Sequence, residues 1–220
     1  MNAFLALRDA WYFFSHNLPT IARLCLPLVI VEALAQQQLT AQLGFESAGA
    51  YNILVGLLFY PLYTGALILF LDARSNGQSP RVRDLLAASL GLWPRFALLT
   101  GISTLAILLG ASLFVLPGLW LMIKLAFAEF LLVLRGFTPL QALHESFEQT
   151  SGYFWQILLC VLVVMTPLWL LAWVTQPAEG AQPDLLFYLL LDSANSFLQL
   201  FATVVLFRLF MLRETLPAQE

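Results

Sequence analysis

The chain has 220 residues, of which 60% are hydrophobic and only 10% are charged, and its formal net charge is -3. Soluble domains carry about 25% charged residues, so this composition excludes an ordinary soluble domain and predicts a membrane protein. The sequence has no long basic run and no basic patch interleaved with aromatic residues, which argues against nucleic acid as a partner.

Six stretches are long and apolar enough to predict membrane-spanning helices. Such a helix needs about 20 mostly apolar residues to cross roughly 30 Å of hydrocarbon. In chain order the predicted spans are residues 18–36, 51–71, 95–115, 119–134, 154–174 and 185–212. The predicted fold class is therefore all-α: one membrane domain, residues 1–220, built as a polytopic bundle of six transmembrane helices.

Three amphipathic stretches precede or separate these spans. The first places Phe4, Leu7, Trp11 and Phe14 at helical spacing, and the second runs from Ser79-Pro80 to Trp93. The third begins at Thr138-Pro139, with Gln141 in the position that completes a capping box. We expect three interfacial helices on the cytoplasmic side of the membrane.

The three stretches also resemble one another. Leu7-Arg8-Asp9, Val82-Arg83-Asp84 and Leu143-His144-Glu145 occupy matching places in them. This similarity suggests a threefold repeat of one interfacial helix followed by a helical hairpin, with units 1–72, 75–135 and 137–213. Amphipathic helices resemble one another by construction, however, so an unrepeated bundle is an equal alternative.

The positions of the basic residues predict the orientation. Nine of the ten Lys and Arg residues fall on one side of a six-span arrangement, and Lys124 alone lies in the interior of a span. By the positive-inside rule that side is cytoplasmic. We therefore expect a multi-pass protein of the bacterial inner membrane with both termini in the cytoplasm.

A rival interpretation joins residues 95–134 into one long helix and gives five spans. That stretch is about twice the length a membrane requires. Because proline lacks an amide donor and glycine tolerates turns, Leu116-Pro117-Gly118 suits a tight hairpin at the outer face. A hairpin over 95–135 that turns before it fully crosses the bilayer remains an alternative.

This order of features resembles a known family. The hairpin Val115-Leu116-Pro117-Gly118, the segment 136–154 and the ending 206–212 are similar to the YciC-like family of bacterial inner-membrane proteins. A more distant similarity is to the membrane region of some glycerophosphodiester phosphodiesterases. The YciC-like resemblance implies six spans and transfers no mechanism, because that family has no established activity or catalytic residues.

Several polar side chains lie at membrane depth, where an ionised group costs roughly 2.5–3.5 kcal/mol. Glu32, Lys124 and Asp192 are predicted at a common outer level, and Glu129 lies nearer the midplane. The last span adds a polar stripe at three- and four-residue spacing. Its members are Asp192, Asn195 or Ser196, Gln199 and Thr203.

Three interpretations of this cluster stay open. In the first, Lys124 pairs with Asp192 or Glu32, and Asn195 and Gln199 hold helices together. In the second, the same residues line a polar cavity, open toward the outer leaflet, that admits a lipid headgroup or small solute. In the third, Glu129 belongs to a proton relay.

The sequence contains no recognised catalytic motif, and neither histidine has a partner at metal-ligand spacing, so no cofactor or metal is expected. The leading hypothesis is a non-enzymatic protein with an accessory role in envelope or lipid homeostasis. The alternatives are a small transporter or channel that uses the intramembrane charges, and an enzyme acting on lipid headgroups. Expected partners are membrane lipids, with another envelope protein or a second copy of this chain as further options.

Overall fold

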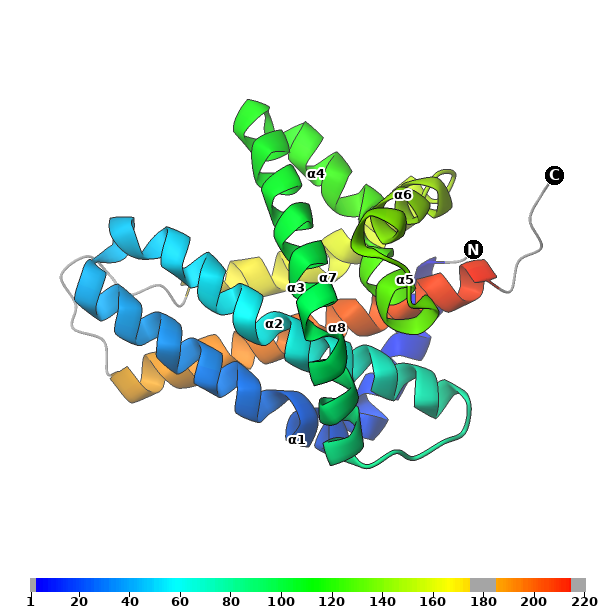
Figure 1. Cartoon of the computed structure of the whole chain (residues 1–220), viewed down its shortest axis with the longest axis horizontal. Helices are drawn as coiled ribbons and strands as arrows, with labels where there is room; N and C mark the ends of the chain where they lie inside the picture. The colour runs from blue at the N-terminus through cyan, green and yellow to red at the C-terminus, as the bar shows by residue number, and fades with distance from the viewer. Residues whose placement is uncertain (1–2, 175–184, 215–220) are drawn as a thin grey trace.

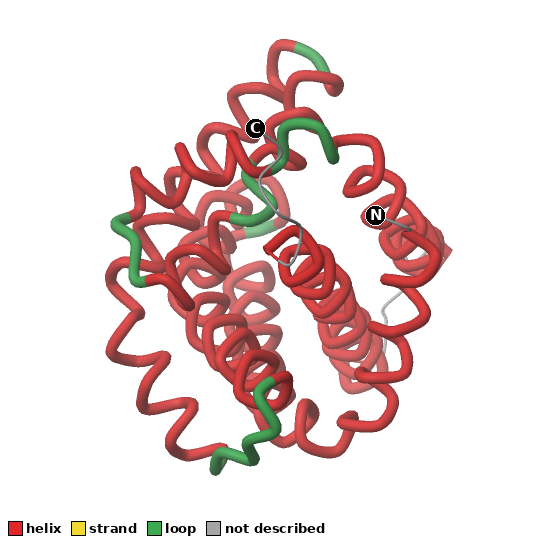
Figure 2. The backbone as a smooth tube through the Cα atoms, turned by 90° about the vertical axis from the view of Figure 1, so that its right-hand side faces the viewer, coloured by secondary structure: helices red, strands yellow, loops and turns green. Residues whose placement is uncertain are grey.

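The computed structural model describes residues 3–174 and 185–214, and almost all of these are helical (Figure 1). The helices are α1 (Ala3–Leu43), α2 (Phe45–Ser75), α3 (Val82–Leu113), α4 (Val115–Lys124), α5 (Ala128–Arg135), α6 (Pro139–Gln149), α7 (Phe154–Val174) and α8 (Leu185–Glu214). Figure 2 shows the same backbone as helices joined by short loops, with no strand in the described ranges.

The predicted six-span, all-α fold class is confirmed. Within the described ranges, six segments are long and apolar enough to cross a membrane, and α4 and α5 together make the fourth. They are Phe4–Leu43, Gly49–Ser75, Val82–Leu113, Val115–Arg135, Phe154–Trp173 and Leu189–Arg213.

Helices α1, α2, α7 and α8 run along the long axis of the molecule, whereas α3 crosses them and leads into a hairpin with α4 that leans away (Figure 1). The start of α1, the end of α8 and the loop between α2 and α3 lie toward one end of this axis. The turn between α1 and α2 lies toward the other end. The turn between α3 and α4 lies apart from both ends, at the tip of the hairpin that leans away, so the side of the membrane on which each loop lies stays a prediction.

Helix α5 belongs to the hydrophobic core and is buried along most of its length. Phe130 of α5 stacks on Phe210 of α8 with ring centroids 5.5 Å apart, and Phe127, just before α5, meets the same ring at 5.6 Å. All three rings are at most 1% exposed. Because α5 is held from several sides, a polar residue on it has a fixed position inside the bundle.

The first two amphipathic stretches differ from the expected separate helices. Helix α1 continues through Pro19 and Pro27, and α3 continues through Pro94, so each stretch is one helix with the span that follows. A proline removes only one backbone hydrogen bond, and neighbouring helices compensate for such losses in membrane bundles. Figure 1 shows α1 bent along its length, as proline-containing helices often are.

Side chains fasten the first part of α1 to its neighbours. Arg208 of α8 pairs with Asp9 at 3.1 Å, and Arg74 of α2 donates to the side-chain amide oxygen of Asn17 at 3.3 Å. Trp11 meets Phe201 edge-on at 5.7 Å. These contacts place the N-terminal part of α1 across α8 and the end of α2.

The third amphipathic stretch is a separate helix, α6, and its predicted capping box is present. The Thr138 amide donates to the Gln141 side-chain oxygen at 3.2 Å. The three stretches are therefore not built alike, and the threefold repeat stays a prediction, as does the placement of these segments at the headgroup level.

The hairpin of the third and fourth spans turns earlier than predicted. Helix α3 ends at Leu113, Phe114 is extended, and α4 begins at Val115, so Pro117 and Gly118 lie inside the first turn of α4. Proline is tolerated in a first turn because the amides there have no intrahelical partner.

Gly118 serves close packing rather than the turn. A Cβ at this position would lie 2.7 Å from the Cβ and 2.9 Å from the backbone of Ala111. A Cβ at Gly110 would lie 3.1 Å from the Gly118 nitrogen. Two glycines on facing helices thus allow the backbones of α3 and α4 to approach each other directly.

Candidate functional site

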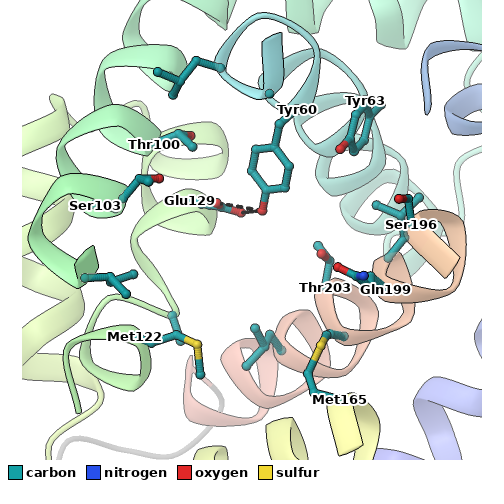
Figure 3. Close-up of a pocket in the computed structure, with 18 of the residues that line it drawn as sticks. Tyr60, Tyr63, Thr100, Ser103, Met122, Glu129, Met165, Ser196, Gln199 and Thr203 are labelled. Atoms are coloured by element: carbon teal, nitrogen blue, oxygen red, sulfur yellow. Dashed lines mark hydrogen bonds between the residues drawn. The ribbon is translucent and has the colours of Figure 1, made fainter. Parts of the chain in front are cut away.

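A cavity of about 590 Å³ lies inside the bundle (Figure 3). All six spans contribute to its wall. Side chains of α1, α2, α3, α7 and α8 line it, together with side chains of the α4–α5 region. Polar groups converge on it from α3, α5 and α8. Several of the polar residues singled out in the sequence line it.

Three of the predicted intramembrane acids line this cavity: Glu32 of α1, Glu129 of α5 and Asp192 of α8. Asp192 lies near enough to Glu32 for the two carboxylates to interact electrostatically. No Lys, Arg or His residue is among the described residues of the wall. The described part of the wall is therefore acidic, because it carries carboxyl groups and no basic side chain.

The carboxylate of Glu129 is held by Tyr60 of α2. The Tyr60 hydroxyl donates to it and lies 3.0 Å and 3.2 Å from its two oxygens, as the dashed lines in Figure 3 mark. Glu32 accepts a hydrogen bond from the Gln36 amide at 3.2 Å and also interacts with Tyr63. Neutral donors thus orient these two acids, and neither has a basic partner among the described residues of the wall.

The polar stripe of the last span faces the cavity in part. Ser196, Gln199 and Thr203 of α8 line it (Figure 3), but Asn195, which the sequence left as an alternative to Ser196, does not. The Asn195 side-chain oxygen is instead buried without a hydrogen-bond partner among the described residues.

A second set of hydroxyls comes from α3 and was missed in the sequence. Thr100, Ser103 and Thr104 line the wall opposite α8. Their three- and four-residue spacing places them on one helix face, which is a signal that could have been read. Tyr60 and Tyr63 were also missed, because tyrosine in a span is ordinarily assigned to packing.

Lys124 does not join the cluster, and the prediction that it pairs with Asp192 or Glu32 is wrong. Its ammonium group donates to the Ser151 hydroxyl at 2.7 Å and to the Phe147 carbonyl at 3.4 Å. It also lies 5.3 Å from the centre of the Phe147 ring. The carbonyls and the dipole at the end of α6 favour a cation at that position, and aromatic faces add to the attraction.

The fourth span is broken where the sequence predicted one helix over 119–134. Helix α4 ends at Lys124, three residues form a turn, and α5 begins at Ala128. The predicted span contains no Gly or Pro, so its own residues do not predict the break.

Buried hydroxyls of α6 and of its C-cap residue, Thr150, supply hydrogen bonds to the backbone at this break. The Phe127 amide donates to the Ser146 hydroxyl oxygen at 3.1 Å. The Lys124 carbonyl accepts from the Ser146 hydroxyl at 2.8 Å and from Thr150 at 3.3 Å. Both hydroxyl residues are fully buried. Interrupted helices are tolerated at membrane depth when neighbouring protein satisfies the backbone in this way.

The break borders the cavity. Leu125 and Ala126 of the turn line the wall, and Glu129 lies in the first turn of α5 directly beyond it. In transporters, half-helices that end at membrane depth commonly frame the solute site. Here the same arrangement places a carboxylate next to a point where the helix can bend.

The cavity reaches the molecular surface. Ile53 of α2 and Trp169 of α7 line it and are 42% and 53% exposed. Both lie in the half of their helix nearer the α1–α2 turn, which is the end predicted to face the outer leaflet.

Within the described residues, no group of three or more His, Cys, Asp or Glu side chains is placed to hold a metal ion. The two cysteines, Cys25 and Cys160, are buried.

The sequence matches a known but uncharacterised protein family. Residues 29–212 match the uncharacterised protein family UPF0259. A UPF0259 membrane protein of Sodalis glossinidius (strain morsitans) is 28% identical over 186 residues, which cover 80% of this chain and 72% of that protein. No solved structure matches this chain. Neither match bears on the distant resemblance to glycerophosphodiester phosphodiesterases.

Proposed function

This chain belongs to the uncharacterised protein family UPF0259 and is a multi-pass membrane protein, and we propose that its acidic cavity binds small organic cations and carries them across the membrane. The proposal assigns no catalytic step. We place the protein in the bacterial inner membrane with its termini in the cytoplasm, so the cavity opens toward the outer leaflet.

One observation carries the proposal: Glu32, Glu129 and Asp192 line one cavity whose described wall has no basic side chain. A charge at membrane depth costs roughly 2.5–3.5 kcal/mol, and carboxylates that share a cavity also repel one another. Either protons or a cationic ligand must offset these costs. The cavity volume of about 590 Å³ lies within the usual range for small-molecule sites and far exceeds the needs of a proton.

The wall favours an organic ammonium group as the cation. Tyr60, Tyr63 and Trp169 line the cavity, and aromatic faces attract alkylammonium groups. The hydroxyls of α3 and α8 add acceptors for N–H donors on either side of the carboxylates. The acids come from three helices rather than from one point, which suits a solute that carries two separated ammonium groups, such as a linear diamine.

The broken fourth span supplies a means of movement for transport. The cavity wall includes Met122 and Ile123 on α4 and Glu129 on α5, so it extends across the break. A change of angle between α4 and α5 would move one part of the wall relative to the other. Such bending at an interrupted helix is the kind of motion by which transporters expose a site to one side at a time.

Calorimetric titration of the purified protein with putrescine tests the binding step, with the uncharged diol of equal length as the control ligand. We expect the diamine to bind and the diol not to bind. Glu129→Gln and Glu32→Gln should each weaken diamine binding about tenfold, because each removes one charge-assisted contact. Asp84→Asn, an exposed acid of α3 outside the cavity, should leave it unchanged.

Uptake of labelled putrescine into vesicles that contain the protein tests the transport step. Uptake should exceed that of empty vesicles and fall in the Glu129→Gln variant. Equal affinity for the diamine in the Glu129, Glu32 and Asp84 variants would overturn the cation-binding proposal. Binding without uptake would overturn the transport part.

An accessory role in lipid or envelope homeostasis is the second candidate function. The observation that favours it is an apolar groove on the outside of the bundle, separate from the acidic cavity. A strain that lacks the gene should then show an altered phospholipid composition, measured by mass spectrometry of its membranes. An unchanged composition would count against this role and leave the cation proposal untouched.

A further inference from the structure

An apolar groove of about 760 Å³ runs between the first part of α1, α7 and α8. Among the described residues, its wall consists of aliphatic and aromatic side chains with one exception, Arg8. Several of these side chains are strongly exposed, among them Phe4 at 73%, Trp11 at 61% and Val163 at 53%. The groove is therefore a surface that the described part of the chain does not cover.

Arg8 is available to an outside anion. It is exposed and makes no hydrogen bond or ion pair with the other described residues. The neighbouring acid, Asp9, is already paired with Arg208 at 3.1 Å. A guanidinium group at the rim of an otherwise apolar groove is complementary to a molecule with an anionic head and an apolar tail.

The dimensions of the groove match one leaflet of a bilayer. Along α7 the lining extends from Leu159 to Leu168, which is about 14 Å of helix at 1.5 Å per residue. Half of a hydrocarbon core of roughly 30 Å is about 15 Å. Arg8 lies beside Asp9 and Arg208, in the cytoplasmic charge cluster predicted by the positive-inside rule.

We propose that this groove binds one anionic phospholipid of the cytoplasmic leaflet, with the phosphate at Arg8 and an acyl chain along α7. The site deepens the second candidate function, the role in lipid homeostasis, and does not depend on cation transport. A zwitterionic lipid could also offer its phosphate, but it lacks the net negative charge that a basic residue at the membrane surface attracts.

Native mass spectrometry of the protein released from bilayers of equal parts phosphatidylglycerol and phosphatidylcholine tests the site. We expect a retained lipid with a preference for phosphatidylglycerol. Arg8→Gln should lower this preference about fivefold, the loss expected for one basic residue near the surface. Arg8→Lys should keep most of the preference. Arg23→Gln, an exposed arginine of α1 outside the groove, should leave it unchanged.

A second pair of variants tests the groove without changing charge. Val163→Trp fills the groove and should reduce retention of both lipids, whereas Leu162→Trp, next to it on α7 but outside the lining, should not. Equal lipid preference in the wild-type protein and the Arg8→Gln variant would overturn the proposal. Retention unaffected by Val163→Trp, or a second copy of the chain bound in place of lipid, would also overturn it.

These results can be told apart from the lipid-composition test of the deletion strain. A lost preference in the Arg8→Gln protein together with an unchanged cellular composition supports the site and refutes the homeostasis role. An altered composition without any lipid preference in the purified protein does the opposite.

Discussion

Ser146 is the residue on which the broken fourth span depends most directly, and removing its hydroxyl should destabilise the protein measurably. The hydroxyl accepts from the Phe127 amide at 3.1 Å and donates to the Lys124 carbonyl at 2.8 Å, and the residue is fully buried. In Ser146→Ala the Phe127 amide loses its acceptor, the Ser146 hydroxyl oxygen. The carbonyl keeps the Thr150 hydroxyl at 3.3 Å.

The magnitude follows from this asymmetry. A buried amide left without a partner costs about 1–3 kcal/mol, and the partly replaced carbonyl bond adds less. Hydrogen bonds in membrane bundles average below these values, because the unfolded chain in the membrane also finds partners. We therefore expect Ser146→Ala to lower the free energy of unfolding by about 2 kcal/mol, and Thr150→Val by about 1 kcal/mol.

The double variant separates this account from general loss of packing. When both hydroxyls are removed, the Lys124 carbonyl loses both of its side-chain donors. The double variant should therefore lose more free energy of unfolding than the two single variants together. Equilibrium unfolding of the detergent-solubilised protein measures all three, with Ser112→Ala, an exposed serine of α3, as the control near zero. Strictly additive losses, or a Ser146→Ala loss no larger than that of Ser112→Ala, would refute the reasoning.

Three further predictions concern the packing, the charge and the topology. Gly118→Ala should destabilise the α3–α4 hairpin by about 1–3 kcal/mol, because the new methyl group meets the facing backbone. Gly91→Ala has nothing within 4 Å of the new methyl group and should be neutral or stabilising. Unfolding measurements compare the two variants. Lys124→Gln should lower stability but leave putrescine affinity unchanged, since this lysine lies outside the cavity; a large change in affinity would contradict its placement. A cysteine at Gln78 should react with an impermeant thiol reagent only from the cytoplasmic side, and a cysteine at Gln42 only from the outside. Reaction of both cysteines from the same side would refute the six-span topology.

The number and order of the spans could be predicted from the sequence because each span is a local property of composition. About 20 apolar residues are needed for each crossing, and basic residues next to the spans indicate which of their ends face the cytoplasm. The acids of the cavity could also be singled out, because an ionisable residue in an apolar segment is conspicuous wherever its partners lie. Glu32, Glu129 and Asp192 do share one cavity.

The position of Lys124 and the break after it could not be predicted in the same way. Depth along a helix says at which level a side chain lies but not toward which neighbour it points. Lys124 and Asp192 were assigned to one level, yet the lysine turns to the end of α6. The break is likewise decided from outside the span, since Ser146 of α6 and Thr150, which caps the end of α6, supply the hydrogen bonds that stabilise it.

Helix α6 therefore connects two features that look independent in the sequence. Its buried hydroxyls support the interrupted backbone, and its C-terminal carbonyl and Ser151 hold the ammonium group of Lys124. If Lys124 reached the cavity instead, it would neutralise one carboxylate there and reduce the attraction for a cation. By holding this lysine elsewhere, α6 leaves Glu32, Glu129 and Asp192 without a basic partner within the described wall. The acidity of the cavity thus depends on a helix that contributes no side chain to its lining.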